Sequence, residues 1–372
     1  MCFAKHLLVP WHCAAGAFFL TTAVAVGMAT NAQAAGWDDV SVIQHKDYQA
    51  VTSTGGSAYN PSSFPIRLRG VVLNNNEDWL DPTSNLCTVP GYQWIWMGGQ
   101  AEFYIQAVNL DGTEWDPDTN TAFNDFGGTS SWMGQNYGNT MHYSATDYTT
   151  LSLPWNYTES DWYSELDRLK LNRPGTLLSE SQLVRAGDLV EVRANIGLAY
   201  KGKMNVNESH SNASVNDFEV VVLKDGYGLP TATKLELSAL KDPSNKDIFD
   251  ATRATGGEHY QSTLVTLENV RLTDTMAWGK NSDLTLADAT GRTLGIHLGL
   301  NEGFSTTSAP TGFFDVTGIL DQADSGGKGG YRLLAMNADS FVVVPEPGTI
   351  ILLVAGAAAA LFGLAIRGRR TA

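Results

Sequence analysis

The chain has 372 residues, of which 43% are hydrophobic and only 17% charged, and its formal net charge is -15. This much apolar material can form more than one buried core, so the composition excludes an intrinsically disordered chain. The acidic balance argues against nonspecific nucleic-acid binding, which depends on Lys and Arg that neutralise phosphates. Cations and neutral glycans fit the charge better, and the plentiful Gly, Asn, Ser and Thr favour an all-β fold.

Residues 1–34 predict a secretory signal peptide. Lys5 precedes an apolar run over residues 14–28, and Ala32-Gln33-Ala34 has the small-x-small form that signal peptidase accepts. A first helix of the fold is the alternative, but the run is short and polar residues follow it at the distance a cleavage site requires. Removing the leader leaves Cys87 as the only cysteine, which excludes an intramolecular disulfide and favours a small buried hydrophobe over a reactive thiol.

Residues 35–224 predict a first β-barrel that carries a large insertion over residues 79–162. The insertion is expected to contain an amphipathic helix that Thr158 caps. Apolar, β-branched segments that predict the strands of this barrel lie at residues 66–73, 102–108, 189–194, 204–206 and 218–223.

The insertion holds seven of the ten tryptophans and is rich in Asn, Asp, Gly and Tyr. Sugar sites combine aromatic rings, on which pyranose faces pack, with short polar groups that bind the hydroxyls. We therefore expect a polysaccharide site here, with Trp94, Trp96, Trp115 and Trp132 as candidate ligand-binding residues. The alternative is that these rings fill the core of an oversized loop.

An oxygen-rich cluster lies in the same insertion. Asp116, Asp118 and Asn120 match the first three ligand positions of an EF-hand and are the candidate ligands for Ca2+. Thr121 stands where that loop needs glycine, however, and Gly127 stands where it needs the closing Glu. A solvated acidic loop is therefore the favoured interpretation, with Ca2+ as the alternative and no other cofactor expected.

Residues 225–257 are expected to form a linker packed against a second barrel at residues 258–344. This second region is a series of short alternating segments separated by Gly, Asp, Asn and Ser turns, which predicts a small closed barrel. The sequence at 217–221 echoes that at 339–343, which indicates that the two barrels are degenerate repeats. The predicted strands of the second barrel are 265–272, 284–287, 293–298, 313–320, 331–334 and 341–344.

Within this region, the segments 263–270, 286–291, 316–320 and 330–334 resemble the OB-fold domain found beside secreted bacterial nucleases. The resemblance covers roughly residues 230–344 and implies a fold of two OB-like β-barrels in tandem. The nuclease itself is absent, so no catalytic activity is carried over. In an OB module that binds single-stranded nucleic acid, Tyr331 and Arg332 would contact the ligand, with Lys328 in the glycine-rich loop between two strands.

The C-terminus combines three unlike elements in a fixed order. Val344-Pro345-Glu346-Pro347-Gly348 precedes an uncharged run over residues 349–366, long enough to span about 27 Å of bilayer as a helix. Arg367, Arg369 and Arg370 follow, and such residues stay cytoplasmic, so the rest of the chain must lie on the other side of the membrane. This order resembles the PEP-CTERM sorting signal, which implies cleavage by an exosortase and delivery to the cell surface. A plain C-terminal anchor is the alternative.

No Gly-x-Ser-x-Gly elbow, phosphate-binding loop or dinucleotide fingerprint occurs in the sequence. The leading hypothesis is therefore a noncatalytic exported protein, anchored in the inner membrane before processing and then presented at the cell surface, where it binds exopolysaccharide. Its expected partners are signal peptidase, an exosortase-type enzyme and the membrane, with nucleic acid disfavoured. The alternatives are a single-stranded nucleic-acid-binding protein and an unrecognised glycoside hydrolase.

Overall fold

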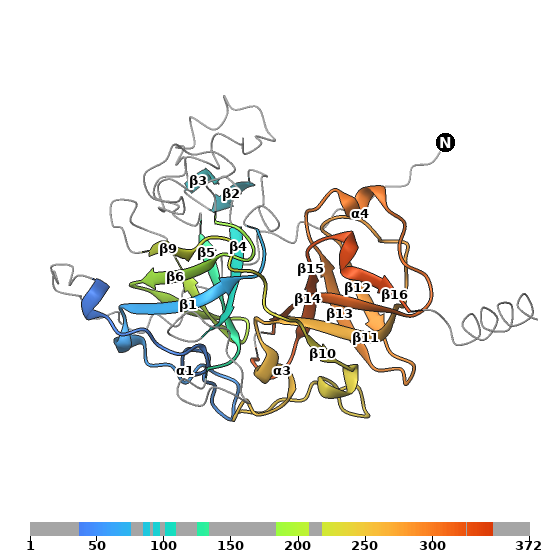
Figure 1. Ribbon diagram of the computed structural model, residues 1–372, viewed down its shortest axis with the longest axis horizontal. Coiled ribbons are helices and arrows are strands. Elements are labelled where there is room, and N and C mark those ends of the chain that lie inside the picture. Colours follow the sequence, from blue (N-terminus) through green and yellow to red (C-terminus); the bar gives the residue numbers. More distant parts are fainter. Residues whose placement is uncertain are drawn as a thin grey trace, which may run out of the picture.

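The computed structural model describes residues 37–75, 85–89, 92–96, 101–108, 125–133, 184–207, 218–324 and 326–344. These residues form two β-structured bodies that lie side by side (Figure 1). The predicted signal peptide, most of the insertion and the sorting signal lie outside the described residues. Among the helices that the structure describes, none has the length and hydropathy to cross a bilayer.

The C-terminal body is a closed barrel. Its sheet has the order β10-β11-β12-β13-β15-β14-β16, and an additional β11–β14 pairing joins five of the strands into a ring. Within that ring β13 and β15 run parallel and the other pairs run antiparallel. The strands are β10 (Thr233–Leu235), β11 (Leu264–Leu272), β12 (Asp283–Ala287), β13 (Thr293–Leu298), β14 (Phe314–Gln322), β15 (Tyr331–Ala335) and β16 (Phe341–Val343).

The N-terminal body repeats this connectivity. Its sheet has the order β7-β8-β5-β4-β1-β6-β9, with β5 and β8 parallel where the second barrel has β13 and β15. Only residues 195 and 196 separate β6 from β7, so the two strands form one bent segment. This segment pairs with β1 through β6 and with β8 through β7, and it corresponds to β14 of the second barrel. Its strands are β1 (Ile66–Val72), β4 (Ala101–Ala107), β5 (Gly128–Met133), β6 (Leu189–Ala194), β7 (Gly197–Tyr200), β8 (Lys203–Asn207) and β9 (Phe218–Lys224).

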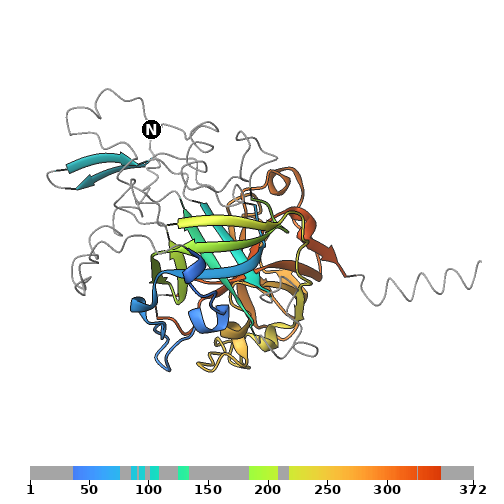
Figure 2. The same ribbon diagram turned by 60° about the vertical axis from the view of Figure 1, so that its left-hand side comes forward.

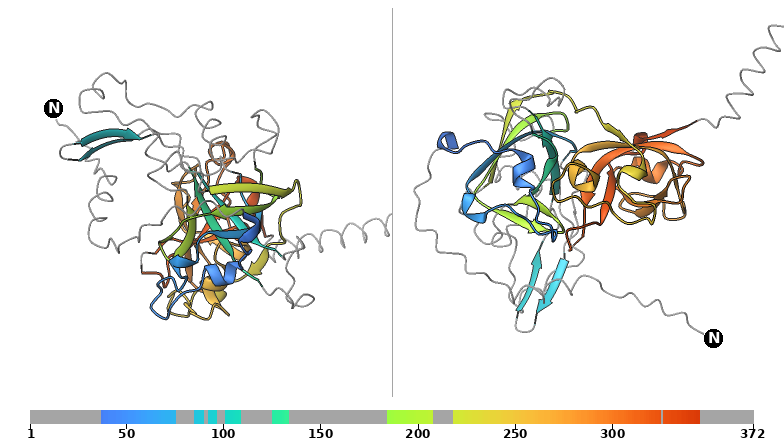
Figure 3. Two further views of the ribbon diagram at one scale, coloured as in Figure 1. Left: turned by 90° about the vertical axis from the view of Figure 1, so that its left-hand side faces the viewer. Right: turned by 90° about the horizontal axis from the view of Figure 1, so that it is seen from below.

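Three further features correspond between the bodies. β9 pairs with β6 as β16 pairs with β14, and the parallel bridge from Val42 to Arg67 stands where β10 pairs with β11. A short helix precedes the first strand of each ring: α1 (His45–Tyr48) in one and α3 (Gly256–Tyr260) in the other. The predicted all-β class is therefore confirmed, and the strand order repeats from one barrel to the next. Figures 2 and 3 show the two bodies from further directions.

The remaining elements are short. A separate hairpin consists of β2 (Asn85–Val89) and β3 (Tyr92–Trp96). The other described helices are η1 (Trp37–Asp39), η2 (Pro61–Ser63), η6 (Leu237–Ala239), α4 (Gly303–Thr306) and η7 (Ala338–Ser340).

Each barrel encloses its own apolar core, and a third cluster lies between the barrels. The first core includes Leu68, Phe103 and Val192, and the second includes Leu267, Leu286 and Phe314. Burial of each such side chain contributes about 1.5–3 kcal/mol. The cluster between the barrels combines residues from both bodies: Leu73 and Tyr104 from the first, and Ile319 and Leu334 from the second.

Candidate ligand site at the junction of the barrels

A buried charge network joins the two barrels at the outer face of β4, β8 and β14. Lys203 lies at its centre and donates from Nζ to Glu102 Oε1 at 3.1 Å, to the Tyr104 hydroxyl at 3.1 Å and to Asp321 Oδ1. Asp321 also accepts from the Tyr104 hydroxyl and from Arg332 Nε, each at 3.0 Å. We call these residues the Lys203 network: Glu102, Tyr104, Lys203, Asp321 and Arg332.

The charges of this network stabilise one another. Burial alone would lower the pKa of Lys203, but the carboxylates of Asp321 and Glu102 outweigh it, so its pKa is raised. Burial would likewise raise the pKa of Asp321, but Lys203 and Arg332 hold that pKa below its ordinary value. Lys203, Asp321 and Arg332 therefore stay ionised near neutral pH, and the two basic groups of the network lie beside carboxylates from both barrels.

A second contact joins the helices that precede each ring. Arg253 donates from Nη1 to the Lys46 carbonyl at 3.3 Å and from Nε to the Glu258 carbonyl at 2.9 Å. Its guanidinium lies 5.4 Å from the centre of the Phe126 ring, on which His259 also stacks. The two barrels are thus fixed to one another at two separate places.

Glycines allow a third, very close contact. Gly55 and Gly327 both have positive φ angles, and a Cβ on Gly327 would lie 2.0 Å from the Gly55 carbonyl oxygen. No side chain fits such a gap, which is the physical reason for glycine on both sides. The glycine-rich run at 326–330 connects β14 to β15, as predicted, and it packs against the first barrel.

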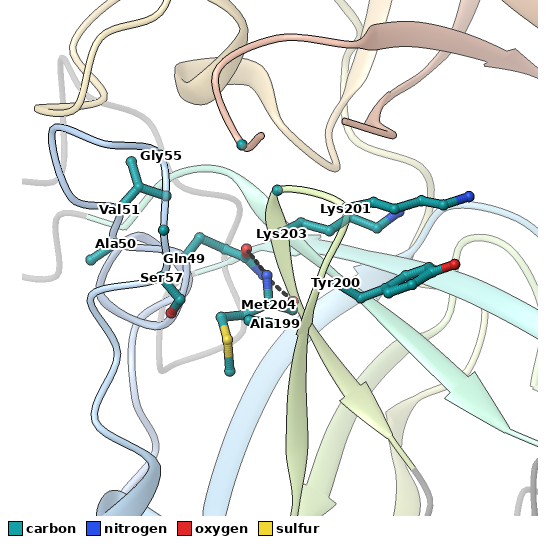
Figure 4. Close-up of a pocket in the computed structure, with 13 residues that line it drawn as sticks. Gln49, Ala50, Val51, Gly55, Ser57, Ala199, Tyr200, Lys201, Lys203 and Met204 are labelled. Atoms are coloured by element: carbon teal, nitrogen blue, oxygen red, sulfur yellow. Dashed lines mark hydrogen bonds between the residues drawn. The ribbon is translucent and has the colours of Figure 1, made fainter. Parts of the chain in front are cut away.

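A pocket of about 130 Å³ lies beside this contact (Figure 4). Three segments line it: residues 49–57, the tip of the β7–β8 hairpin, and Gly327. The hairpin turns through Lys201 and Gly202, whose φ angles of 51° and 89° match a two-residue turn of the primed type. The volume is below the usual range for small-molecule sites, so the pocket can hold one substituent of a larger ligand.

The polar atoms of Gln49 in this pocket already form hydrogen bonds within the protein. Its Nε2 donates to the Met204 carbonyl at 2.6 Å, and its Oε1 accepts from the Met204 backbone N–H at 2.9 Å. Figure 4 shows Tyr200 and Lys201 pointing away from residues 49–57, on the outer side of the hairpin. There the exposed side chains of Ile196, Leu198 and Tyr200 occupy alternate positions and form an apolar stripe. We call the stripe and Lys201 together the hairpin surface.

The structure describes three of the four candidate tryptophans. Trp94 and Trp96 belong to β3, opposite Cys87 and Asn85 in the hairpin register. Trp132 lies on β5 opposite Glu102 and is half-buried. Trp115 lies outside the described residues, so the predicted sugar site cannot be assembled from this part of the chain.

One predicted ligand contact, Tyr331, is corrected. Tyr331 faces the core of the second barrel with 3% exposure, and its hydroxyl donates to Glu258 Oε1 at 2.5 Å. No ring face of Tyr331 is therefore free to stack on a base. Arg332 donates from Nε to Asp321 in the Lys203 network, and its side chain keeps 34% exposure.

The candidate Ca2+ ligands Asp116, Asp118 and Asn120 lie outside the described residues, as do Pro345, Glu346, Pro347, Arg367, Arg369 and Arg370. In the ranges given above, no group of three or more His, Cys, Asp or Glu side chains could hold a metal ion.

The sequence did not reveal the Lys203 network. Lys203 and Asp321 lie 118 residues apart, and no local spacing predicts that they meet. A partial signal exists in Glu102-Phe103-Tyr104-Ile105, where large apolar residues occupy both faces of one strand. Such a pattern indicates burial of both faces, which here means the core on one side and the second barrel on the other.

The strand order defines an all-β protein built from two barrels of like connectivity. Residues 343–370 match the family model of the PEP-CTERM protein-sorting motif. The chain thus carries an exosortase sorting motif, which implies association with the membrane before sorting to the cell surface.

No curated protein matches the chain. One solved structure with some similarity is described as the tetrameric p202 HIN2. It is 9% identical, with a TM-score of 0.20 over 75% of this chain and 94% of that one. A score this low carries no argument about fold or function.

Proposed function

We propose that this protein is a noncatalytic surface protein that binds a neutral polysaccharide of the envelope or extracellular matrix across the hairpin surface. The observation that carries the proposal is the exposed stripe over residues 196–200 beside a small pocket, in a chain whose sorting motif implies presentation at the cell surface. OB-type modules bind oligosaccharides as well as oligonucleotides, which agrees with this role.

The chemistry of the hairpin surface favours a sugar. Tyr200 is 42% exposed, and Lys201 Nζ lies 5.2 Å from the centre of its ring. A pyranose can pack its apolar face on such a ring while its hydroxyls bind the neighbouring lysine and the backbone. The pocket beyond the hairpin tip would then take one substituent of the sugar chain.

Two buried carboxylates form structural contacts with basic side chains, which supports a noncatalytic role. Glu191 accepts hydrogen bonds from Arg67, Arg69 and Arg193, and Asp321 is bound by Lys203 and Arg332. Glycoside hydrolysis needs two carboxyl groups that face a bound sugar, about 5–10 Å apart. These carboxylates instead serve the sheet and the interface.

The test is a titration of the surface form, purified from its cells, with neutral polysaccharides, single-stranded oligonucleotides and Ca2+. Tryptophan fluorescence and calorimetry should show a saturable glycan response that salt does not weaken. Tyr200→Ala should lower the affinity about fivefold, as expected for loss of one stacked ring. Leu229→Ala, at an exposed apolar residue elsewhere, is the matched control and should bind like the wild type.

Two outcomes would overturn the proposal. A response confined to single strands that collapses with salt would indicate a nucleic-acid-binding protein. Turnover of the glycan, lost when one carboxylate is replaced, would indicate an enzyme.

A further inference from the structure

The folded body continues without a linker into the sorting motif, whose match begins at Val343, the last residue of β16. β16 pairs with β14 in the register Phe314–Val343, Asp315–Val342 and Val316–Phe341. Beyond the strand, the Val344 backbone N–H donates to the Phe313 carbonyl at 3.0 Å. The next residue is Pro345, the first of the motif's prolines.

Side-chain packing fixes this last strand to the barrel. The Phe341 ring lies 5.2 Å from that of Trp278 and 5.3 Å from that of Phe314, measured between ring centres. Phe304 completes the aromatic cluster at 6.4 Å. These contacts hold β16 in place, so the position at which the chain leaves the barrel is well defined.

The chain leaves little room between the barrel and a bilayer. Five residue steps separate Val344 from Thr349, where the uncharged run over residues 349–366 begins. A fully extended chain covers about 18 Å in that distance. The headgroup layer alone takes up roughly 5–7 Å of it. Before processing, the end of β16 would therefore lie within about 11–13 Å of the headgroup layer.

The surface around this exit point suits a bilayer. Val342 and Val343 are 62% and 58% exposed, and Met276 is 93% exposed on the loop that carries Trp278. The guanidinium of Arg271 lies 5.8 Å from the centre of the Phe313 ring, beside the point where Val344 is bound. We call Arg271, Met276, Phe313, Val342 and Val343 the tail-proximal surface.

Each group on this surface has a place at a membrane interface. Exposed Met and Val side chains gain by entering the apolar edge of the headgroup layer, and an arginine can bind lipid phosphates. The nearby carboxylate of Asp274 accepts from the Met276 backbone N–H at 2.9 Å, which engages it within its own loop.

We propose that, before sorting, the tail-proximal surface rests on the phospholipid headgroups of the membrane that holds the C-terminal segment. The sorting enzyme then acts on a tag presented directly beneath a docked barrel. This inference rests on the membrane association that the sorting motif implies and is independent of the proposed polysaccharide binding.

The experiment uses the full-length precursor in phospholipid vesicles that contain a lipid with a photoreactive headgroup. After irradiation, mass spectrometry should find lipid adducts on residues 271–276 and 341–344. The exposed loop around Ser53 on the first barrel should be free of them and serves as the internal control. Insertion of twelve Gly and Ser residues between Val344 and Pro345 should reduce the adducts at least fivefold.

A second variant tests the contact of the surface with the membrane separately from the length of the chain that connects them. Met276→Glu combined with Val342→Glu changes two exposed positions, so the fold should be kept, and the adduct yield should fall severalfold. Adducts spread equally over both barrels, or their absence from the tail-proximal surface, would overturn the proposal. Neither result would bear on glycan binding to the hairpin surface.

Discussion

The two barrels share one strand order but reach it by different routes. The second barrel closes with a single nine-residue strand, β14, that pairs with β11, β15 and β16. The first barrel divides the same task between β6 and β7, with a bend at residues 195 and 196. It also accepts long insertions between its strands. Connectivity is therefore the constant property of this architecture, while strand length and loop length vary around it.

Buried polar residues also have corresponding roles in the two barrels. In the first barrel, both ring nitrogens of His45 are bound, one to Thr129 Oγ1 at 2.8 Å and one to the Arg69 carbonyl at 2.9 Å. In the second, Glu258 is bound by Tyr331 and Gln322. Each barrel thus binds the helix that precedes its first strand through one buried titratable group, although the groups differ chemically.

The largest expected effect comes from breaking the link between the barrels. Asp321→Ala would leave Lys203 and Arg332 without their shared carboxylate, and one unpaired buried charge costs about 3–5 kcal/mol. We expect the free energy of unfolding in urea to fall by this amount. The matched control is Glu268→Ala, which removes the exposed ion pair with Lys234 and should have no measurable effect. Equal effects of the two variants would show that the Lys203 network does not hold the interface.

Acid should act on the first barrel through Glu191. Burial would raise the pKa of Glu191, but hydrogen bonds from Arg67, Arg193 and Arg69 lower it to about 2. Because the folded pKa lies below the unfolded one, this stabilisation is complete above about pH 4.5 and is lost as the pH falls toward 2. It amounts to about 3 kcal/mol. Glu191→Gln should flatten the dependence of unfolding free energy on pH in that window, and an unchanged slope would contradict this account.

A smaller effect is expected at the glycine contact between the barrels. Gly312 and Gly327 both have positive φ, but a Cβ meets nothing within 4 Å at Gly312 and meets the Gly55 backbone at Gly327. Gly312→Ala measures backbone strain alone, of about 1 kcal/mol. Gly327→Ala adds the steric clash and should lower the melting temperature clearly further. Equal shifts would mean that the two loops separate easily.

The sequence predicted the second barrel well because its strands alternate and its turns are marked by Gly, Asp and Asn. It missed β5, since Gly128-Thr129-Ser130-Ser131 lacks a clear apolar face. It also missed β7, which has only four residues, two of them Gly197 and Ala199. The same alternation places Tyr331 on one face with Leu333, which indicates the core and argues against a ligand contact. Contacts between the barrels could not be predicted, because they depend on how two folded surfaces meet.

The central claim is that the two barrels, which lie within residues 37–344, stand between a predicted N-terminal leader and the sorting motif. The most direct test is the intact mass of the surface form compared with that of the precursor, together with its terminal peptides. We expect a mature chain that begins at Ala35 and ends at or just beyond Val344, the last residue bound to the barrel. A surface form that keeps residues 349–372, or one that ends within β14 to β16, would contradict the account.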